Sequence, residues 1–246
     1  MPAKSTVRLQ RIVDAADAAD AGPAVEAGPV GPADGSAGAA VDARAVRDYL
    51  ARARLIVTRH AAYLTRLDAV LGDGDHGDNL VIGFRAVQAM LEELPAGTRP
   101  GELLQAVGHR LVGAVGGASG PLYGTAFIEA GFRAGDAESL DPLTLSDMLA
   151  AAADGLGRRG RCEVGDKTIL DALRPAADAF ARVVSDQGSL AEAVIAAEIA
   201  ARDGMHSTRA LVARRGLALR LGDRSAGHLD PGAVSCFLLV RSLAVR

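Results

Sequence analysis

The sequence predicts an all-α domain built from eight antiparallel helices. Large apolar residues recur at three- and four-residue steps over most of the chain. No stretch shows a sustained apolar/polar alternation bounded by hairpin turns. The segments between the periodic stretches are short and rich in glycine, and short connections make consecutive helices antiparallel neighbours.

The helical domain is expected to begin at Asp42, which is a plausible N-cap. The first helix should carry Val46, Leu50 and Val57 on its apolar face and should deliver Asp68 at its end. The other helices are expected over residues 79–94, 101–115, from 121 onward, over 143–156, from the end of Gly165-Asp-Lys-Thr to about 185, over 190–213, and from 231 to near the carboxyl terminus.

Residues 1–41 are rich in Ala, Gly, Pro and Asp and contain few large apolar side chains. Such a segment buries little surface, so we expect a disordered low-complexity extension before a helical domain over 42–246. A short helix between Val7 and Ala19 would have little to pack on. The start of the chain lacks an apolar segment of about 7–15 residues, as a secretory signal would have. No apolar run approaches the roughly 18 residues of a membrane helix, so a cytoplasmic protein with no membrane contact is predicted.

Composition narrows the choice of partners and of core residues. The net charge of −3 and pI near 6.0 give no electrostatic reason to expect nucleic-acid binding. Because aromatic residues make up 3% of the chain and Trp is absent, the core must be built from Ala, Leu and Val. Cys162 and Cys236 form no metal-spaced pair and are expected to be small buried thiols.

The acidic, glycine-rich stretch after the first helix is the most informative part of the chain. It brings Asp68, Asp73, Asp75 and Asp78 within a few residues of one another, with glycines between them. Carboxylates this close repel unless a cation lies among them, and oxygen ligands favour Mg²⁺ or Ca²⁺. An EF-hand is excluded because its twelfth position would be Phe84, where a bidentate Glu is required. Mg²⁺ with substrate phosphates therefore remains, against a simple acidic turn in which Asp78 or Asn79 caps a helix.

Three further segments could carry chemistry. Residues 113–124 are rich in glycine and open a helix, which suits phosphate binding or, alternatively, a close helix–helix contact. The run Gly165-Asp-Lys-Thr168 differs from a P-loop because Asp166 separates Gly from Lys and no strand precedes it, so Asp166 or Thr168 could simply cap a helix. Asp230 followed by Pro231 is a good N-cap and first-turn pair. Alternate loops of an up-and-down bundle share one end, so all four segments should meet there.

These motifs resemble the L subunit of dihydroxyacetone kinase, which also occurs as the nucleotide-binding domain of single-chain dihydroxyacetone kinases. The resemblance covers about residue 42 to the end and rests on four motifs in the right order: Gly72-Asp-Gly-Asp-His-Gly-Asp-Asn79, Gly116-Gly-Ala-Ser-Gly-Pro-Leu-Tyr-Gly-Thr125, Gly165-Asp-Lys-Thr168 and Gly227-His-Leu-Asp-Pro-Gly232. It implies a barrel of eight antiparallel helices with the nucleotide in the loops at one end.

The resemblance also implies a site. Two Mg²⁺ ions would join the phosphates of ADP or ATP to Asp68, Asp73 and Asp75. Nucleotide contacts would come from His76, Gly77, Asp78, Asn79, Ala118, Ser119, Gly160, Thr168, Ile169, Asp230, Pro231 and Gly232. No covalent nucleophile is expected here, because a partner K subunit holds the ketose on a histidine. The phosphoryl donor would be ATP or a phosphotransferase-system M subunit, the latter being commoner for a free-standing L chain, and a homodimer is also compatible.

One departure from the family pattern bears on activity. The family usually has Arg-Gly-Arg-Ala-Ser-Tyr-Leu-Gly before the last motif, whereas this chain has Arg215-Gly-Leu-Ala-Leu-Arg-Leu-Gly222, so Leu217 stands where relatives place an arginine. Arg214, Arg215 or Arg220 could supply the charge instead. Three hypotheses follow: a kinase subunit for dihydroxyacetone or another short ketose, a nucleotide-bound regulatory partner without transfer activity, and a helical carrier that holds a lipid.

Overall fold

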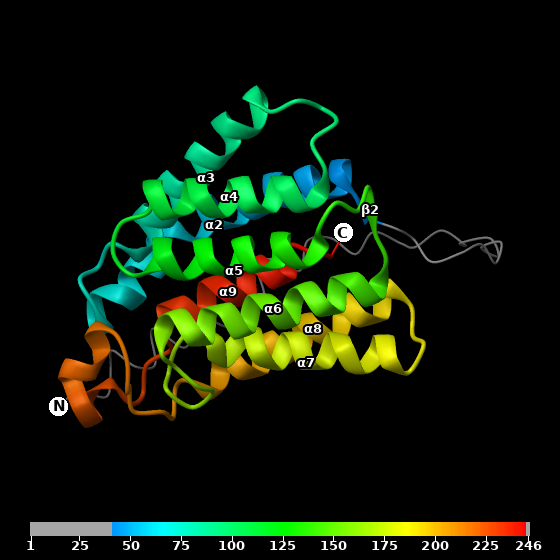
Figure 1. The fold of residues 1–246 in the computed structure, drawn as a ribbon. Coiled ribbons are helices and arrows are strands. Elements are labelled where there is room, and N and C mark those ends of the chain that lie inside the picture. Colours follow the sequence, from blue (N-terminus) through cyan, green and yellow to red (C-terminus); the bar gives the residue numbers. More distant parts are fainter. Residues whose placement is uncertain (1–40, 245–246) are drawn as a thin grey trace, which may run out of the picture. The chain divides into compact units, whose positions relative to one another are not determined.

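The structure is a computed structural model, and it describes residues 41–244. This part of the chain is largely helical, as predicted (Figure 1). In chain order its elements are β1 (Val41–Asp42), α2 (Ala43–Leu71), α3 (His76–Glu93), α4 (Pro100–Ala114), α5 (Ser119–Ala134), β2 (Ser139–Leu140), α6 (Pro142–Gly160), α7 (Leu170–Ser185), α8 (Leu190–Ser207), the 3-10 helix η1 (Leu217–Ser225) and α9 (Pro231–Arg241).

All eight predicted α-helices are present, and their caps explain several of the boundaries. Asp42 caps α2 by accepting the amide of Ala45, as predicted, and Asp230 caps α9 through the amide of Ala233. The expected start of the fourth helix at Pro121 is wrong, because α5 already begins at Ser119. The seventh predicted helix was too long: α8 ends at Ser207, and the chain then turns into η1.

Two features were not predicted. The two-residue strands β1 and β2 pair antiparallel, with Val41 opposite Leu140. They are too short to produce an alternating pattern in the sequence. The 3-10 helix η1 was also missed, and it contains a non-helical Gly222 with a φ of 54°.

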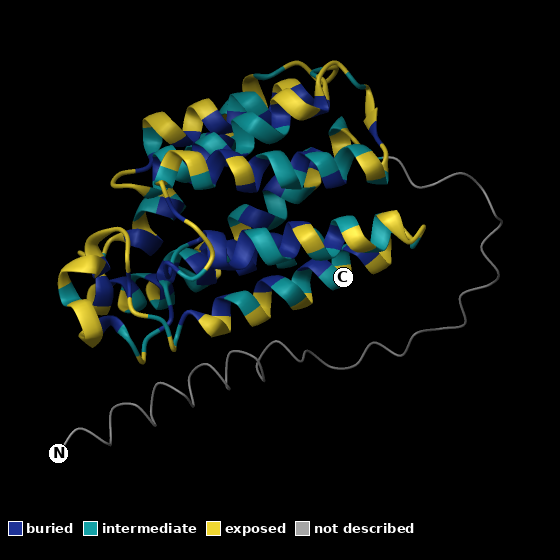
Figure 2. Ribbon diagram, turned by 60° about the horizontal axis from the view of Figure 1, so that its bottom comes forward, coloured by how far each residue is buried: buried dark blue, intermediate teal, exposed yellow. Residues whose placement is uncertain are grey.

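Each helix packs on the next one along the chain, and α9 packs on both α8 and α2. The helices bury the sides that face one another and expose their outer sides (Figure 2). Small residues allow close approach in places: a Cβ at Gly108 would collide with Ile128 and with the carbonyl of Gly124, which lie on α5. The core consists mainly of Leu, Ala and Val, as the composition predicted.

An apolar cavity of about 890 Å³ lies between the helices. Side chains from α2 and from α4 to α9 line it, including Tyr49, Phe127, Met148 and Leu239. Alanines from several helices are also among the lining residues.

Cys162 and Cys236 are buried free thiols, as predicted. No described helix has both the length and the apolar character needed to cross a membrane. The predicted disordered extension and the short helix between Val7 and Ala19 concern residues 1–40, which lie outside the described part, while Val41 belongs to β1.

Candidate functional site

The loops that follow α2, α4, α6 and α8 lie at one end of the helical unit, which we call the loop end (residues 72–75, 115–118, 161–169 and 208–230). Figure 1 shows these four connections on the same side, with η1 beside the loop between α2 and α3. A small apolar cluster of Leu71, Ala213 and Ala218 joins the segment after α8 to the end of α2. The prediction that these loops meet is therefore confirmed.

Three carboxylates converge at the loop end. Asp68, Asp73 and Asp75 each offer an oxygen, and these oxygens all lie within 4.8 Å of one another. Asp68 is buried in the last turn of α2, whereas Asp73 and Asp75 are exposed in the following loop. The position of Asp68 is therefore fixed by the fold, whereas Asp73 and Asp75 face solvent.

The backbone around Asp68 explains the need for glycine. Its Oδ2 atom accepts the amides of Gly74 and Asp75 at 3.0 Å and of His76 at 3.2 Å. Gly74 has a φ of 78°, a left-handed conformation that glycine adopts freely. A Cβ at Gly72 would collide with the Oδ1 atom of Asp68. The loop thus wraps one carboxylate oxygen with amides and leaves the other free of them.

The electrostatics favour a cation in this cluster. Partial desolvation raises the pKa of Asp75 and a hydrogen bond with Asn79 works against this, while the negative charges of Asp73 and Asp68 raise the pKa further. A divalent cation among the three oxygens would remove this repulsion. Carboxylate oxygens are the ligands that Mg²⁺ prefers, so the donor set fits that ion.

His76 connects three helix starts. It is buried in the first turn of α3, and its Nδ1 atom lies 2.9 Å from Ser119 Oγ at the start of α5. Its Nε2 atom lies 2.8 Å from Ser235 Oγ in α9, and that hydroxyl lies 2.6 Å from the hydroxyl of Tyr123. Burial lowers the pKa of His76 to about 4, so the ring is neutral at pH 7.

The glycine-rich segment lies beside the aspartate cluster. Gly117 has a φ of 65°, and Ala118 occupies the exposed N-cap position of α5 without a side-chain capping bond. A Cβ at Gly116 would come within 3.1 Å of the Asn79 side chain, which places this segment against α3. The unpaired amides at the start of α5 are suited to an anion.

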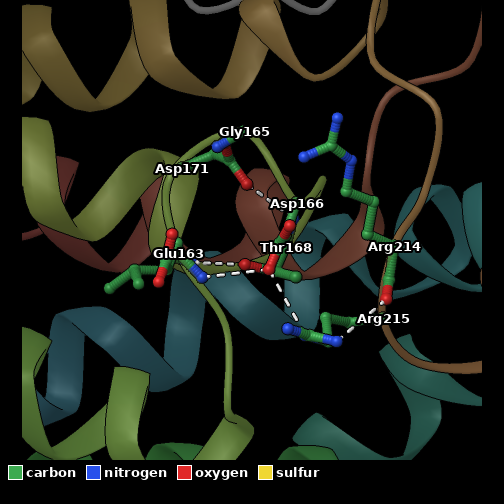
Figure 3. Close-up of polar contacts among 8 residues, drawn as sticks. Glu163, Gly165, Asp166, Thr168, Asp171, Arg214 and Arg215 are labelled. Carbon is green, nitrogen blue, oxygen red and sulfur yellow. Dashed lines mark hydrogen bonds and ion pairs between the residues drawn. The ribbon is translucent and has the colours of Figure 1, made fainter.

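The loop before α7 is held together by hydrogen bonds between its backbone amides and nearby carboxylate side chains. Asp171 accepts the amides of Gly165 and Thr168 at 2.6 Å, and Asp166 accepts the amide of Glu163 at 3.1 Å (Figure 3). Asp166 also pairs with Arg215 at 3.3 Å. This loop is thereby attached to the segment that carries Leu217.

Asp230 and its neighbours complete the loop end. Desolvation of its carboxyl group raises the pKa of Asp230 to about 7, although the positive charge of Lys167 works in the opposite direction. A Cβ at Gly232 would lie 3.4 Å from the Cβ of Ile169, so the starts of α7 and α9 are in contact.

Most of the predicted site residues are therefore brought together, with two differences. Asp78 is exposed in the first turn of α3, and Gly160 is the last residue of α6, beside Cys162 and Leu122. The alternative that Asp78 or Asn79 caps the helix is wrong, because α3 begins at His76.

The alternative that Asp166 caps α7 is wrong as well. Its carboxylate accepts the amide of Glu163, which precedes it. Thr168 Oγ1 accepts the amide of Leu170 at 3.2 Å, but the N-cap of α7 is Ile169, so Thr168 does not occupy the capping position either.

Sequence reasoning missed Ser235, Tyr123 and Asp171. Ser235 and Tyr123 lie among small and apolar residues, in patterns that give no sign of a polar contact. Asp171 follows two apolar residues and resembles an ordinary first-turn acid. Only the contacts across the fold show what these side chains bind.

These features define an all-α protein with an acidic cluster and open helix starts at one end, an arrangement suited to holding a polyanion through a divalent cation. The DAK2 domain family matches residues 70–245. The chain belongs to this family, within its group of DhaL-type subunits.

Curated relatives agree with this placement. The chain is 40% identical over 186 residues to the "PEP-dependent dihydroxyacetone kinase 2, ADP-binding subunit DhaL" of Listeria innocua, covering 75% of this chain and 86% of that protein. It is 39% identical over 200 residues to the DhaL subunit of the PEP-dependent dihydroxyacetone kinase of Escherichia coli, covering 80% of this chain and 94% of that subunit. It is 34% identical over 211 residues to the L-erythrulose 1-kinase of Mycolicibacterium smegmatis, covering 85% of this chain but only 37% of that larger protein.

Among solved structures, the dihydroxyacetone kinase of C. freundii in complex with AMP-PNP and Mg²⁺ matches with a TM-score of 0.62 and 25% identity. The match covers 89% of this chain and 37% of that one. The chain thus spans little more than a third of the solved kinase.

Proposed function

We propose that this chain is the nucleotide-binding, phosphoryl-transfer subunit of a dihydroxyacetone kinase. It would pass a phosphoryl group to dihydroxyacetone held on a partner K subunit. The observation that carries the proposal is the convergence of Asp68, Asp73 and Asp75 within 4.8 Å at the loop end, in a chain whose relatives are named as ADP-binding kinase subunits. Another short ketose, such as erythrulose, is the alternative substrate.

The three aspartates would hold Mg²⁺, and two ions are proposed. When bound, the metal supplies positive charge that neutralises and aligns the phosphate oxygens. Asp68 is suited to fix the position of the site, because three backbone amides already orient its carboxylate. Asp73 and Asp75 are suited to complete it from the solvent side.

The nucleotide would lie across the starts of α3, α5, α7 and α9. We assign its contacts to Ala118 and Ser119, to Thr168, Ile169 and Gly160, and to the two runs His76–Asn79 and Asp230–Gly232. The helix start at Ser119 offers backbone amides that suit a phosphate. Neutral His76 adds a hydrogen-bonding group beside Ser119 without adding charge.

This chain would therefore bind and orient the donor rather than react covalently, as is usual in phosphoryl transfer. The acceptor would be presented by the K subunit at the exposed side of Asp73 and Asp75. We propose a phosphotransferase-system M subunit as the donor that rephosphorylates bound ADP, since the relatives in Listeria and Escherichia coli are named PEP-dependent. ATP is the alternative donor.

The proposal extends to the closure of the helical fold, the bounds of the domain and its location in the cell. The order of packing, in which α9 returns to α2, is consistent with a closed barrel of eight antiparallel helices. We propose residues 42–246 as the nucleotide-binding domain and the cytoplasm as the location.

Calorimetry on the full chain tests the proposal directly. ADP should bind in the presence of Mg²⁺ and should not bind when EDTA replaces it. Asp73→Asn should abolish this binding and the phosphorylation of dihydroxyacetone by the chain with a K subunit. Asp136→Asn is the matched control, because Asp136 is an exposed aspartate beyond the far end of α5. Transfer that survives Asp73→Asn would refute the kinase assignment, and tight ADP binding with no transfer would assign the regulatory role instead.

The apolar cavity favours a second candidate function, that of a carrier for a lipid. Its volume of about 890 Å³ is in the range of small-molecule sites, and its walls are largely apolar. Extraction of the purified protein followed by mass spectrometry should then release a lipid in amounts close to one per chain. A clean extract would rule against this function.

A further inference from the structure

Lys167 is an unusual residue for its position. It is 1% exposed, which is rare for a lysine, and its φ of 63° is left-handed. It is also one of only two lysines among the 27 Lys and Arg residues of the chain. A buried cation in a costly backbone conformation persists only where the surrounding structure requires it.

The ammonium group of Lys167 donates to two backbone oxygens. It donates to the carbonyl of Thr208, the residue after α8, and to the carbonyl of His228, two residues before Asp230. In a P-loop the corresponding lysine reaches the phosphates of the ligand. Here the side chain turns inward, so its role is to join two distant backbone segments.

Those two segments carry part of the nucleotide site proposed above. Thr208 is fully buried, and its Oγ1 atom accepts the amide of Asp230 at 3.0 Å. Asp230 in turn accepts the amide of Ala233 at 2.7 Å and so begins α9. Lys167 therefore fixes Asp230 from both sides, through Thr208 and through His228.

Several hydrogen bonds hold the loop around Lys167 in place. Asp171 binds the amides on either side of it, and the carbonyl of Asp166 accepts the amide of Arg214 at 3.0 Å. Figure 3 shows Arg214 and Arg215 beside this loop. The segment after α8 is thus attached to residues 166 and 167 at several points.

Charge adds to this geometry. The groups that act on the Asp230 carboxylate are Lys167 from the loop before α7, Asp171 from α7 and Asp68 from α2. Arg209, after α8, acts on Lys167. Lys167 is the cation among the three groups acting on Asp230, so its removal would make the ionised carboxylate less favourable.

We propose that Lys167 is a positioning residue of the nucleotide site, whose buried ammonium group holds the end of α8 and the start of α9 in their working arrangement. The inference rests on the proposed function, because it assumes that Asp230 and its neighbours contact the nucleotide.

The test compares Mg²⁺-dependent ADP binding by the full chain with Lys167→Met, Lys167→Arg and the control Lys4→Met, from pH 6 to pH 9. Lys167→Met should weaken ADP binding about tenfold at pH 8, since a hydrogen-bonded charge is lost. As the pH is lowered, ADP affinity should fall when Asp230 becomes protonated. The midpoint of this fall should lie at a higher pH in Lys167→Met, because the pKa of Asp230 rises without the ammonium group. Lys167→Arg keeps the charge and should restore that pH. Unchanged affinity and an unchanged pH midpoint in Lys167→Met would overturn the role of Lys167.

A second variant covers the case in which Lys167→Met fails to fold. Thr208→Val removes the hydroxyl that accepts the amide of Asp230 but keeps Lys167, and it should weaken ADP binding several-fold. Ser207→Ala is its matched control, because the Ser207 hydroxyl also donates to a helix carbonyl but does not contact Asp230. Equal effects of the two changes would overturn the inference. Failure of the unaltered chain to bind ADP would instead contradict the proposed function.

Discussion

Two regions of the loop end are held in place by different kinds of contact. The aspartate loop (residues 68–76) is organised by bonds from Asp68 to amides six to eight residues away. The C-terminal segment (residues 208–232) depends on Lys167, which is 41 positions from Thr208 and 61 from His228. The proposed metal half of the site is therefore organised by local contacts, whereas the proposed nucleotide half depends on contacts between distant segments.

This difference predicts how substitutions should act. Changes in the aspartate loop break a compact local structure at the junction of α2 and α3, so they should lower the free energy of unfolding most. Changes in the contacts of the C-terminal segment should affect nucleotide binding more than stability, since those contacts are fewer and join segments that are distant in the sequence.

The largest effect on stability is expected from Gly77→Ala. Gly77 is buried in α3, and a Cβ there would collide with the carbonyl of Ala61 and the hydroxyl of Thr65 on α2. Backbone cannot move aside cheaply, so we expect a loss of about 3 kcal/mol in the free energy of unfolding, measured by urea titration. Gly113→Ala in α4 is the control, because nothing lies within 4 Å of its Cβ position. Equal stability of the two variants would contradict the close contact between α2 and α3.

Asp68→Asn should have the next largest effect on stability. We expect it to lower the free energy of unfolding by about 2 kcal/mol when measured in EDTA. The amide that replaces the carboxylate bonds less strongly to the three backbone N–H groups around it. Asp73→Asn should leave stability nearly unchanged, since Asp73 is exposed. Both variants should lose Mg²⁺-dependent ADP binding. If Asp73→Asn destabilised the chain as much as Asp68→Asn, the amides around Asp68 would not be what organises the loop.

Tyr123→Phe tests the long-range contacts with a smaller expected effect. The hydroxyl of Tyr123 lies 2.6 Å from Ser235 Oγ, which also contacts His76. Removal of this hydroxyl should lower the free energy of unfolding by about 1 kcal/mol, while the Mg²⁺ affinity measured by calorimetry stays the same. A loss of Mg²⁺ affinity would show that the two halves of the site are not separable.

The smallest effect on stability is expected from Leu217→Arg. Leu217 is 40% exposed at the start of η1, so the change should alter the free energy of unfolding by less than about 0.5 kcal/mol. If the family arginine is needed here, phosphoryl transfer should increase. Leu219→Arg, at a residue 54% exposed, is the control for added charge. Equal gains from both variants would point to general electrostatics instead of a specific contact.

Some of these features could be predicted from the sequence and others could not. The eight α-helices were predicted because apolar periodicity is strong in long helices, while their ends shifted by a few residues where capping decided them, as at Ser119. The 3-10 helix and the two short strands were missed because they lack any periodic pattern. The lipid-carrier hypothesis came from family resemblance, and the cavity that favours it could not be deduced from composition alone.

The sequence by itself placed four aspartates and several glycines within a few residues, which was enough to predict an acidic loop, and the structure brings three of them together, Asp68, Asp73 and Asp75. It could not determine the role of Lys167, the neutral state of His76 or the contact of Ser235 with His76. Those properties come from burial and from partners far along the chain. Only the tertiary structure decides which polar groups lose water together, and that loss sets both their charge and their bonding.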